Sequence, residues 1–168
     1  MRILGLDPGT ATTGYGVIEA QEGELKPIAF GVIETAAAWP VQERLLHIYR
    51  ELGRLLAEFR PDTAGIEELF FGRNITTAIA VGQARGVLLL ALAQAGIPIG
   101  EYSPPKIKQA VTGYGNADKA QMQLMVSQCL KLDAPPRPDD AADGLAVAIT
   151  HYAYYRYATL TENHDRQS

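Results

Sequence analysis

The stretch "ILGLDPGTATTGYGVIEA", residues 3–20, has a carboxylate at the end of its first apolar run. Residues 2–7 have the length and apolar content of a short buried β-strand, and Asp7 is the last residue of that strand. A Pro-Gly turn follows, and an apolar run resumes at Tyr15. Asp7 therefore either starts the turn or belongs to a site whose other members lie further along the chain.

The segments that follow predict two more strands and then an alternation of helices and strands. Residues 14–20 and 25–35 read as strands joined by a hairpin near Glu22-Gly23, and Pro27 indicates an edge position. Apolar spacing predicts further strands and helices, with strands over 63–68 and 97–102 and helices over 41–59, 74–95, 104–111, 119–132 and 139–158. This order predicts an α/β architecture, with a mixed five-stranded sheet flanked by helices.

Length and composition favour one intracellular domain. The 168 residues suit a single domain over 1–158 followed by a polar, disordered tail over 159–168. The single cysteine, Cys129, excludes an internal disulfide, so we expect a cytoplasmic location. We expect no membrane partner, because the apolar segment "GVLLLALA" is short and is flanked by Gln83, Arg85 and Gln94.

Charge is unevenly distributed along the chain. The net charge is −4, but residues 71–137 carry +4, while residues 1–70 carry −5 and residues 138–168 carry −3. This pattern fits a phosphate-binding surface beside a cation-binding site. Ordinary solvated charge that is segregated by chance remains an equal alternative.

Four acids are candidates for that cation site. Asp7 and Glu67 each end a strand, and if those strands are parallel neighbours their carboxyl ends share one edge of the sheet. Asp140 and Asp143 have the i, i+3 spacing that places two side chains on one face of a helix. Four converging carboxylates without clustered Cys or His indicate Mg²⁺ or Mn²⁺ rather than zinc. Turn formation by Asp7 and helix capping by Asp140 are the alternatives.

At these residues the sequence resembles the RuvC family of bacterial Holliday-junction endonucleases, within the ribonuclease-H-like superfamily. The resemblance extends to about His151 and rests on "GLDPGTATTGYGVIE", "GIEELFFGRN", "GQARGV", "IKQAVTGYG" and "DDAADGLAVAITH", in family order. It implies a ribonuclease-H-like fold with Asp7, Glu67, Asp140 and Asp143 as the catalytic metal ligands. Some relatives have histidine at the position of Asp140, and Glu68 departs from the uncharged residue often found there.

The resemblance also implies an activity and partners. The family acts as a homodimer that cuts two strands of a four-way junction in recombination and repair, together with the RuvA and RuvB branch-migration complex. Two Mg²⁺ ions per active site, for which Mn²⁺ would substitute, would bracket the scissile phosphate and leave 5′-phosphate and 3′-hydroxyl ends.

Basic and aromatic residues predict the DNA contacts. Lys108 and Lys119 match lysines that the family places near the cleaved strand, and Lys106 and Arg73 add charge nearby. Phe70 matches an aromatic residue that stacks on an unpaired base, although burial in the core is the alternative for one of Phe70 and Phe71.

Other function classes share parts of this pattern. "DPGTATTGYG" also looks like a phosphate loop of actin-like ATPases and sugar kinases, but a second such loop is lacking. Related ribonuclease-H-like nucleases that act on RNA share the opening motif, and a catalytically inactive DNA-binding module is the third alternative. The helix over 74–95 is apolar on more than one face, which indicates either full burial or a dimer interface.

Overall fold

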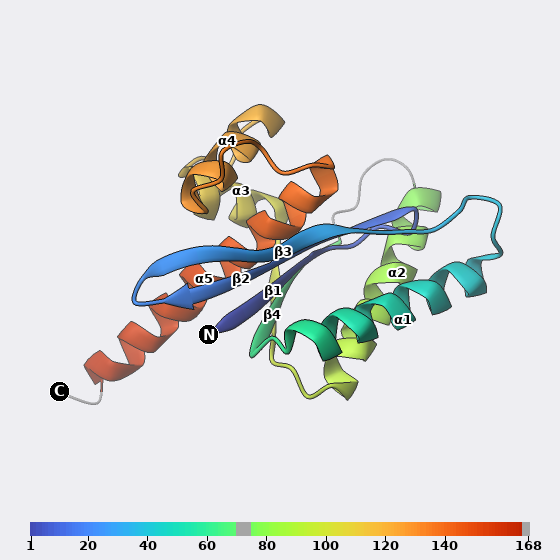
Figure 1. Ribbon diagram of the computed structural model, residues 1–168, viewed down its shortest axis with the longest axis horizontal. Helices are drawn as coiled ribbons and strands as arrows, with labels where there is room; N and C mark the ends of the chain where they lie inside the picture. Colours follow the sequence, from blue (N-terminus) through green and yellow to red (C-terminus); the bar gives the residue numbers. More distant parts are fainter. Residues whose placement is uncertain (70–74, 166–168) are drawn as a thin grey trace.

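The computed structural model describes residues 1–69 and 75–165, which form five strands and five helices (Figure 1). In chain order the elements are β1 (Arg2–Asp7), β2 (Thr12–Gln21), β3 (Glu24–Glu34), α1 (Val41–Phe59), β4 (Thr63–Glu67), α2 (Ile75–Gln94), β5 (Ile99–Tyr102), α3 (Pro104–Thr112), α4 (Lys119–Cys129) and α5 (Asp139–Asp165).

The strands form one mixed sheet in the order β3-β2-β1-β4-β5, which confirms the predicted architecture. β1 lies at the centre, antiparallel to β2 and parallel to β4, and β5 continues in parallel from β4. β3 is an edge strand, as Pro27 predicted. Pro27 lies opposite Ile18, beside a register shift between Val17 and Ile18, where the ladder is already interrupted.

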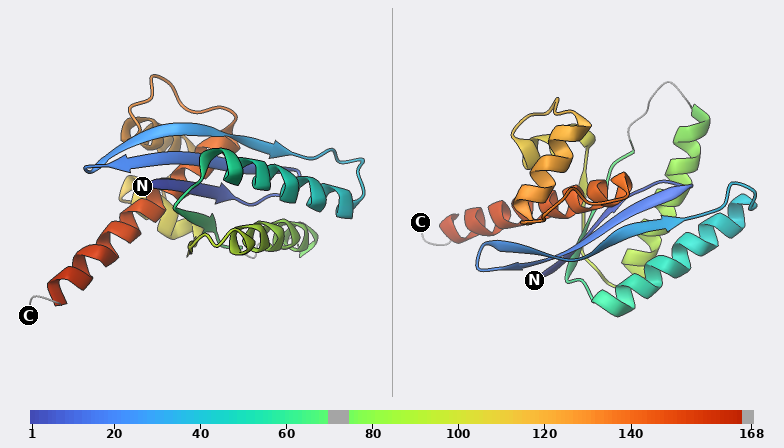
Figure 2. Two further views of the ribbon diagram at one scale, coloured as in Figure 1. Left: turned by 60° about the horizontal axis from the view of Figure 1, so that its bottom comes forward. Right: turned by 45° about the horizontal axis from the view of Figure 1, so that its top comes forward.

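Helices cover both faces of the sheet, with α1 and α2 on one face and α3, α4 and α5 on the other (Figures 1 and 2). The alternation of side chains in β1 divides the core accordingly. Leu4 and Leu6 pack in the cluster that includes α1 and α2, whereas Ile3 packs in the cluster that includes α3 to α5. Asp7, four residues after Ile3, therefore faces the α5 side of the sheet.

Glycines let α5 approach the sheet at backbone contact. A Cβ atom on Gly5 would lie 2.2 Å from the Gly144 carbonyl oxygen, and one on Gly14 would lie 1.9 Å from the Asp140 carbonyl oxygen. Any side chain at these positions would push the start of α5 away from β1 and β2. The small residues thus fix the distance between the strand ends and the helix start, where the candidate acids lie.

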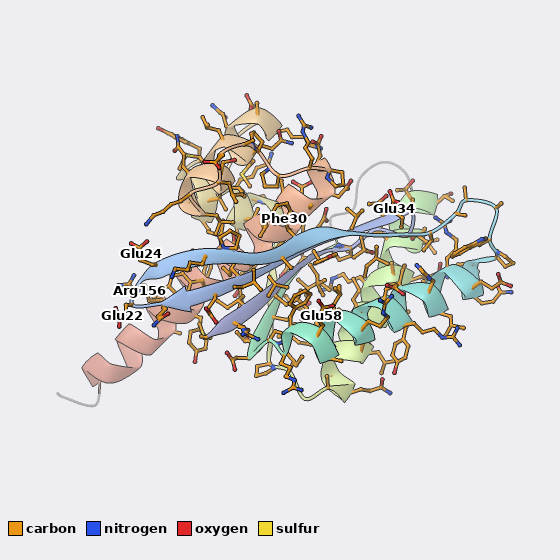
Figure 3. The ribbon with its side chains drawn as sticks, viewed as in Figure 1. Glu22, Glu24, Phe30, Glu34, Glu58 and Arg156 are labelled. Atoms are coloured by element: carbon orange, nitrogen blue, oxygen red, sulfur yellow. The ribbon has the colours of Figure 1, made fainter. Side chains whose placement is uncertain are left out.

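The last helix is longer than the sequence predicted. α5 continues to Asp165, so residues 159–165 of the expected polar tail are helical. The second half of α5 runs beside the β2–β3 hairpin, and Arg156 lies near the hairpin turn that holds Glu22 and Glu24 (Figure 3). This contact is made at Arg156, so the hairpin supports the helix before the segment 159–165 begins. The domain boundary at residue 158 stays a prediction.

Helix α2 is apolar along most of its length. Its segment Thr76–Gln94 is long and apolar enough to cross a membrane by length and composition, with a mean hydropathy of 1.5, and 22% of it is buried. The prediction that this segment is too short to span a membrane is therefore wrong as far as its length is concerned. Arg85 in mid-helix pairs with Glu101 of β5, which ties one side of α2 to the sheet.

Candidate metal centre and nucleic-acid interface

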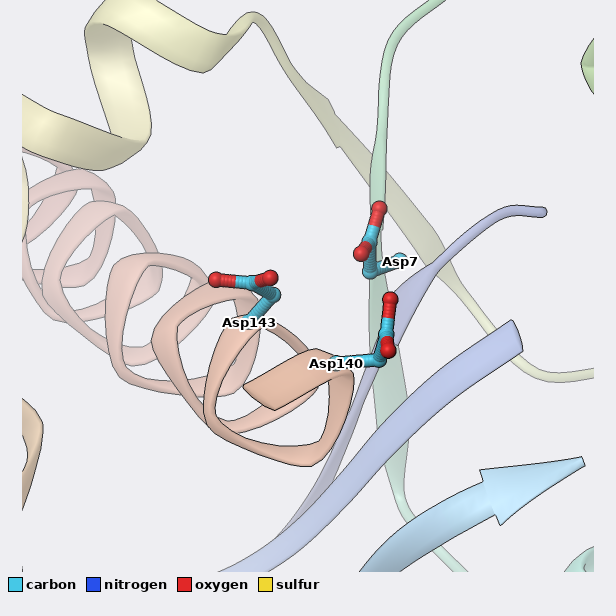
Figure 4. Close-up of side chains that lie close together, drawn as sticks. All are labelled: Asp7, Asp140 and Asp143. Carbon is cyan, nitrogen blue, oxygen red and sulfur yellow. The ribbon is translucent and has the colours of Figure 1, made fainter. Parts of the chain in front are cut away.

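Three of the four predicted acids converge at one edge of the sheet. Carboxylate oxygens of Asp7, Asp140 and Asp143 all lie within 4.8 Å of one another. Asp7 comes from the end of β1, and the two others come from the first turns of α5, where Asp140 points toward Asp7 (Figure 4). The i, i+3 spacing thus places Asp140 and Asp143 on the helix face that meets the strand ends.

Glu67 joins these three aspartates from the neighbouring strand, and we call the four residues the acid group. Leu6 pairs with Ile66 in the parallel register of β1 and β4, so Asp7 and Glu67 follow at the same level. The two carboxyl groups share a hydrogen bond. The Arg85 side chain donates a hydrogen bond of 3.1 Å from Nε to the Glu67 carbonyl oxygen, which fixes the end of β4 from the α2 side.

Burial and mutual repulsion make these acids hard to ionise in the protein alone. Burial, and next the charges of Glu67, Asp143 and Asp140, raise the pKa of Asp7 to about 8. Burial and then the charge of Asp143 raise the pKa of Glu67 to about 7. Burial also raises the pKa of Asp143, against the opposing effect of Lys119.

The donor set fits a hard divalent cation. Four carboxylates supply only oxygen ligands, and a bound cation would offset both their burial and their repulsion. Oxygen-only ligation suits Mg²⁺ or Mn²⁺. The residues present are therefore chemically suited to the metals that the sequence predicted.

The structure also bears on the alternatives for single acids. The turn after Asp7 is closed by Thr13, whose hydroxyl donates a 2.7 Å hydrogen bond to the Gly9 carbonyl oxygen. At the start of α5, Asp139 pairs with Lys119 and Arg137, while Asp140 points into the acid group. Asp7 and Asp140 therefore lie in the acid group rather than serving only the turn and the helix end.

Three of the acids line a cleft of about 300 Å³ that basic residues also line. Lys108 of α3 and Lys119 of α4 line it together with Asp7, Glu67 and Asp143. Lys119 is 3.1 Å from Asp139, and this hydrogen bond is the main reason why its pKa is raised. A cleft lined by both carboxylates and ammonium groups can hold a metal-bound phosphodiester.

The remaining predicted DNA contacts lie outside this cleft or outside the described residues. Lys106 is exposed on α3 and does not line the cleft. Phe70 and Arg73 lie outside the residues that the structure describes, and so does Phe71.

Two residues that shape the site were not identified from the sequence. Asp118 lines the cleft and caps α4, accepting a 2.8 Å hydrogen bond from the Gln121 backbone nitrogen. The spacing Asp118-x-x-Gln121 is a capping-box pattern that could have revealed the cap. The role of Arg85 in holding the end of β4 had no sequence signal, because its partners lie on two other elements.

Comparison with known proteins shows which family and fold the chain matches. The family model described as crossover junction endodeoxyribonuclease RuvC matches residues 3–151. The RuvC of Chloroflexus aurantiacus is 60% identical over 151 residues, covering 90% of this chain and 92% of the relative, and that of Syntrophomonas wolfei is 53% identical over 163 residues, covering 97% and 95%. The structure of Thermus thermophilus RuvC in complex with a Holliday junction substrate superimposes with a TM-score of 0.89 at 38% identity, covering 95% of this chain and 97% of that one.

Proposed function

The chain belongs to the RuvC family of crossover junction endodeoxyribonucleases, and from this membership we propose that it resolves Holliday junctions by metal-dependent cleavage of DNA strands. The observation that carries the proposal is the group of four acids on β1, β4 and α5, three of which line one cleft together with two lysines. A relative with 38% identity and the same fold was solved with a junction bound, which favours a junction over linear DNA or RNA as the substrate.

We propose that Asp7, Glu67, Asp140 and Asp143 hold two Mg²⁺ ions, for which Mn²⁺ substitutes. Metal ions bound there would lower the pKa of an attacking water and offset the charge that develops on the departing oxygen. By holding these ions, the acids would position the scissile phosphate in front of this water, and departure of the 3′ oxygen would leave 5′-phosphate and 3′-hydroxyl ends. Such ends can be ligated directly, as recombination and repair require.

Basic side chains of the same cleft would hold the DNA. Lys108 and Lys119 bind backbone phosphates beside the scissile one, as point charges with flexible stems. Lys106 extends this surface along α3. From the family resemblance, we propose that Phe70 stacks on a base and that Arg73 contacts a phosphate.

We propose a homodimer that forms through α2. Its exposed residues Ile79, Gln83, Gly86, Leu90 and Ala93 recur at intervals of four and three, on one face of the helix. Ile79 is 60% exposed and Leu90 is 55% exposed, and a Cβ atom at Gly86 would meet nothing within 4 Å. Such a face suits packing against the same helix of a second copy, and a two-fold dimer would present two equivalent sites to two equivalent DNA strands.

We place the protein in the cytoplasm, in the same process as the RuvA and RuvB branch-migration complex. Support for this comes from the family resemblance and from the single cysteine, Cys129, which is free.

Cleavage of synthetic substrates tests the proposed function. Purified protein is incubated with a labelled four-way junction, a linear duplex and an RNA–DNA hybrid of matched sequence in Mg²⁺. We expect symmetric, ligatable nicks in the junction alone and binding without efficient cutting in Ca²⁺. Preferential cutting of the hybrid would instead support the RNA nuclease alternative, and ATP hydrolysis without nucleic acid would support the actin-like one.

A further inference from the structure

A second cleft lies next to the acid group. It is on the other side of Asp140 from the cleft lined by Lys108 and Lys119, which we call the lysine cleft. It has a volume of about 520 Å³ and is lined by the connection between β1 and β2, by α1, by the start of α2 and by α5. Asp140 lines this second cleft, whereas Asp7, Glu67 and Asp143 line the lysine cleft. Because Asp7, Asp140 and Asp143 lie within 4.8 Å of one another, the acid group joins the two clefts.

Arg44 is the basic residue of this second cleft. Its Nε donates a 2.7 Å hydrogen bond to the hydroxyl of Thr35, and that hydroxyl donates a 2.6 Å hydrogen bond to the Thr10 carbonyl oxygen. The Thr10 hydroxyl in turn donates a 2.6 Å hydrogen bond to the Ala80 carbonyl oxygen. This chain of bonds connects α1, the β1–β2 connection and α2, so the guanidinium is held in place by one nitrogen.

The other two nitrogens of Arg44 remain for a ligand. Within residues 1–69 and 75–165, no acid forms an ion pair with this side chain. A half-buried guanidinium without an acidic partner, fixed through Nε, can present its terminal nitrogens to a phosphate. The cleft otherwise offers threonine hydroxyls and small residues, from Thr10, Thr12, Thr76 and Ala80, which leave room for a polar chain.

We infer that the Arg44 cleft binds a backbone phosphate of the cleaved DNA strand, next to the scissile phosphate and on the opposite side from the phosphates held by Lys108 and Lys119. The inference rests on the proposed function and deepens it. A polymer cut at an internal bond must leave the acid group on two sides, and the lysine cleft provides for only one of them. With Arg44 on the second side, the strand is held at both ends of the reacting bond.

The test combines Arg44 variants with single neutral phosphates in the junction. Neutral methylphosphonates replace the phosphates one at a time, over three positions on each side of the cut, and junction affinity is measured in Ca²⁺ over a range of salt concentrations. For the wild type, we expect one position on the side away from the lysines to weaken binding about tenfold. Arg44→Gln should weaken binding of the unmodified junction by a similar factor, show no further loss at that one position, and lower the salt slope by about one.

Controls separate the phosphate contact from general charge and from folding. Arg50→Gln removes the same charge from an exposed position of α1 that does not line the cleft, and should leave affinity within about twofold. Thr12→Glu adds a negative charge to the cleft without removing the Arg44–Thr35 bond, and should weaken binding like Arg44→Gln. Melting temperatures identify variants that fail to fold.

The outcomes distinguish this inference from the proposed function. Equal losses from methylphosphonates in wild type and Arg44→Gln at every position, or unchanged affinity of both Arg44→Gln and Thr12→Glu, would overturn the assignment while junction cleavage stands. Failure of the wild type to bind or cut any junction would overturn both.

Discussion

Asp7 occupies a position where ionisation is unfavourable in the metal-free protein. Burial and the neighbouring carboxylates raise its pKa from 3.8 to about 8, so the folded state resists losing this proton. The same group in the unfolded chain ionises freely above pH 4. The acid group therefore destabilises the metal-free protein increasingly as the pH rises from about 4 through 8.

Asp7→Asn should consequently raise the stability of the metal-free protein and lower its cleavage activity. In metal-free buffer at pH 9, we expect the variant to be more stable than the wild type by ~2 kcal/mol, because one buried ionisation is removed. The difference should shrink toward pH 4. Chemical denaturation in EDTA measures this.

Junction cleavage by the same variant should fall at least about a thousandfold, while binding is retained. Lower stability at pH 9, or cleavage at the wild-type rate, would contradict the role assigned to Asp7.

His151 is a second buried titratable residue, and its surroundings fix its tautomer. The Thr63 hydroxyl donates to the Pro98 carbonyl oxygen, so the imidazole Nε2 must donate to Thr63, over 2.7 Å. Nδ1 then accepts from the Tyr102 hydroxyl, over 2.8 Å. Burial lowers the pKa of His151 from 6.5 to about 4, so the neutral ring is the folded form.

Stability should therefore fall as the pH drops from about 6.5 to 4, because His151 takes up a proton in the unfolded chain but stays neutral in the folded protein. We expect this residue to contribute ~2 kcal/mol of the loss. His151→Gln should be less stable at pH 7 but lack this part of the pH dependence. Parallel slopes for wild type and variant over pH 4–6.5, by denaturant titration, would show that His151 is not the source.

At the scale of elements, the packing of α5 on β1 and β2 sets the position of two of the four acids. A Cβ atom on Gly144 would lie 2.5–2.7 Å from backbone atoms of Tyr15, so no side chain fits between helix and strand. Backbone atoms cannot move aside without shifting the whole element. Gly144 directly follows Asp143, and the helix start would shift with it.

Gly144→Ala is therefore expected to lower the free energy of unfolding by ~2–3 kcal/mol and to reduce cleavage strongly in the fraction that folds. Gly53→Ala is the matched control: it lies in α1 with nothing within 4 Å of its Cβ position. That change should stabilise the protein by ~0.5–1 kcal/mol, because alanine favours the helix. Thermal melts and cleavage rates of both variants test the pair, and unaltered cleavage by a folded Gly144→Ala would disprove the close-packing argument.

At the scale of the whole molecule, the proposed two-fold dimer would link the structure to cleavage of two strands. The exposed face of α2 leaves apolar surface uncovered in one chain, while its other side is held to the sheet by buried residues such as Leu88 and Leu92. The same two-sided character explains why the segment also passes the length and hydropathy criteria for a membrane span.

A charge on that face should separate the two copies. Ile79→Glu combined with Leu90→Glu is expected to convert a dimer to monomers in sedimentation velocity and to abolish simultaneous cutting of the two strands. Leu46→Glu, at a 45% exposed position of α1, is the control and should leave the assembly unchanged. A wild type that sediments as a monomer at all concentrations would refute the dimer.

The amino-acid sequence alone was sufficient to predict the order of elements and three of their consequences: the mixed sheet, the edge position of β3 at Pro27, and the pairing of strand-end acids with an i, i+3 pair of aspartates. These follow from local patterns, because side-chain period, turn residues and strand-end position are written in neighbouring residues. The resemblance to the RuvC family rested on the same local motifs.

Which groups meet across elements became known only from the folded chain. The packing of α5 against β2 and β3, the hold of Arg85 on the end of β4, the burial that raises the pKa of Asp7, and the cleft around Arg44 all depend on residues far apart in the chain. Their physical cause is burial and close approach, which arise when helices pack on a sheet. No period or motif in a single segment carries that information.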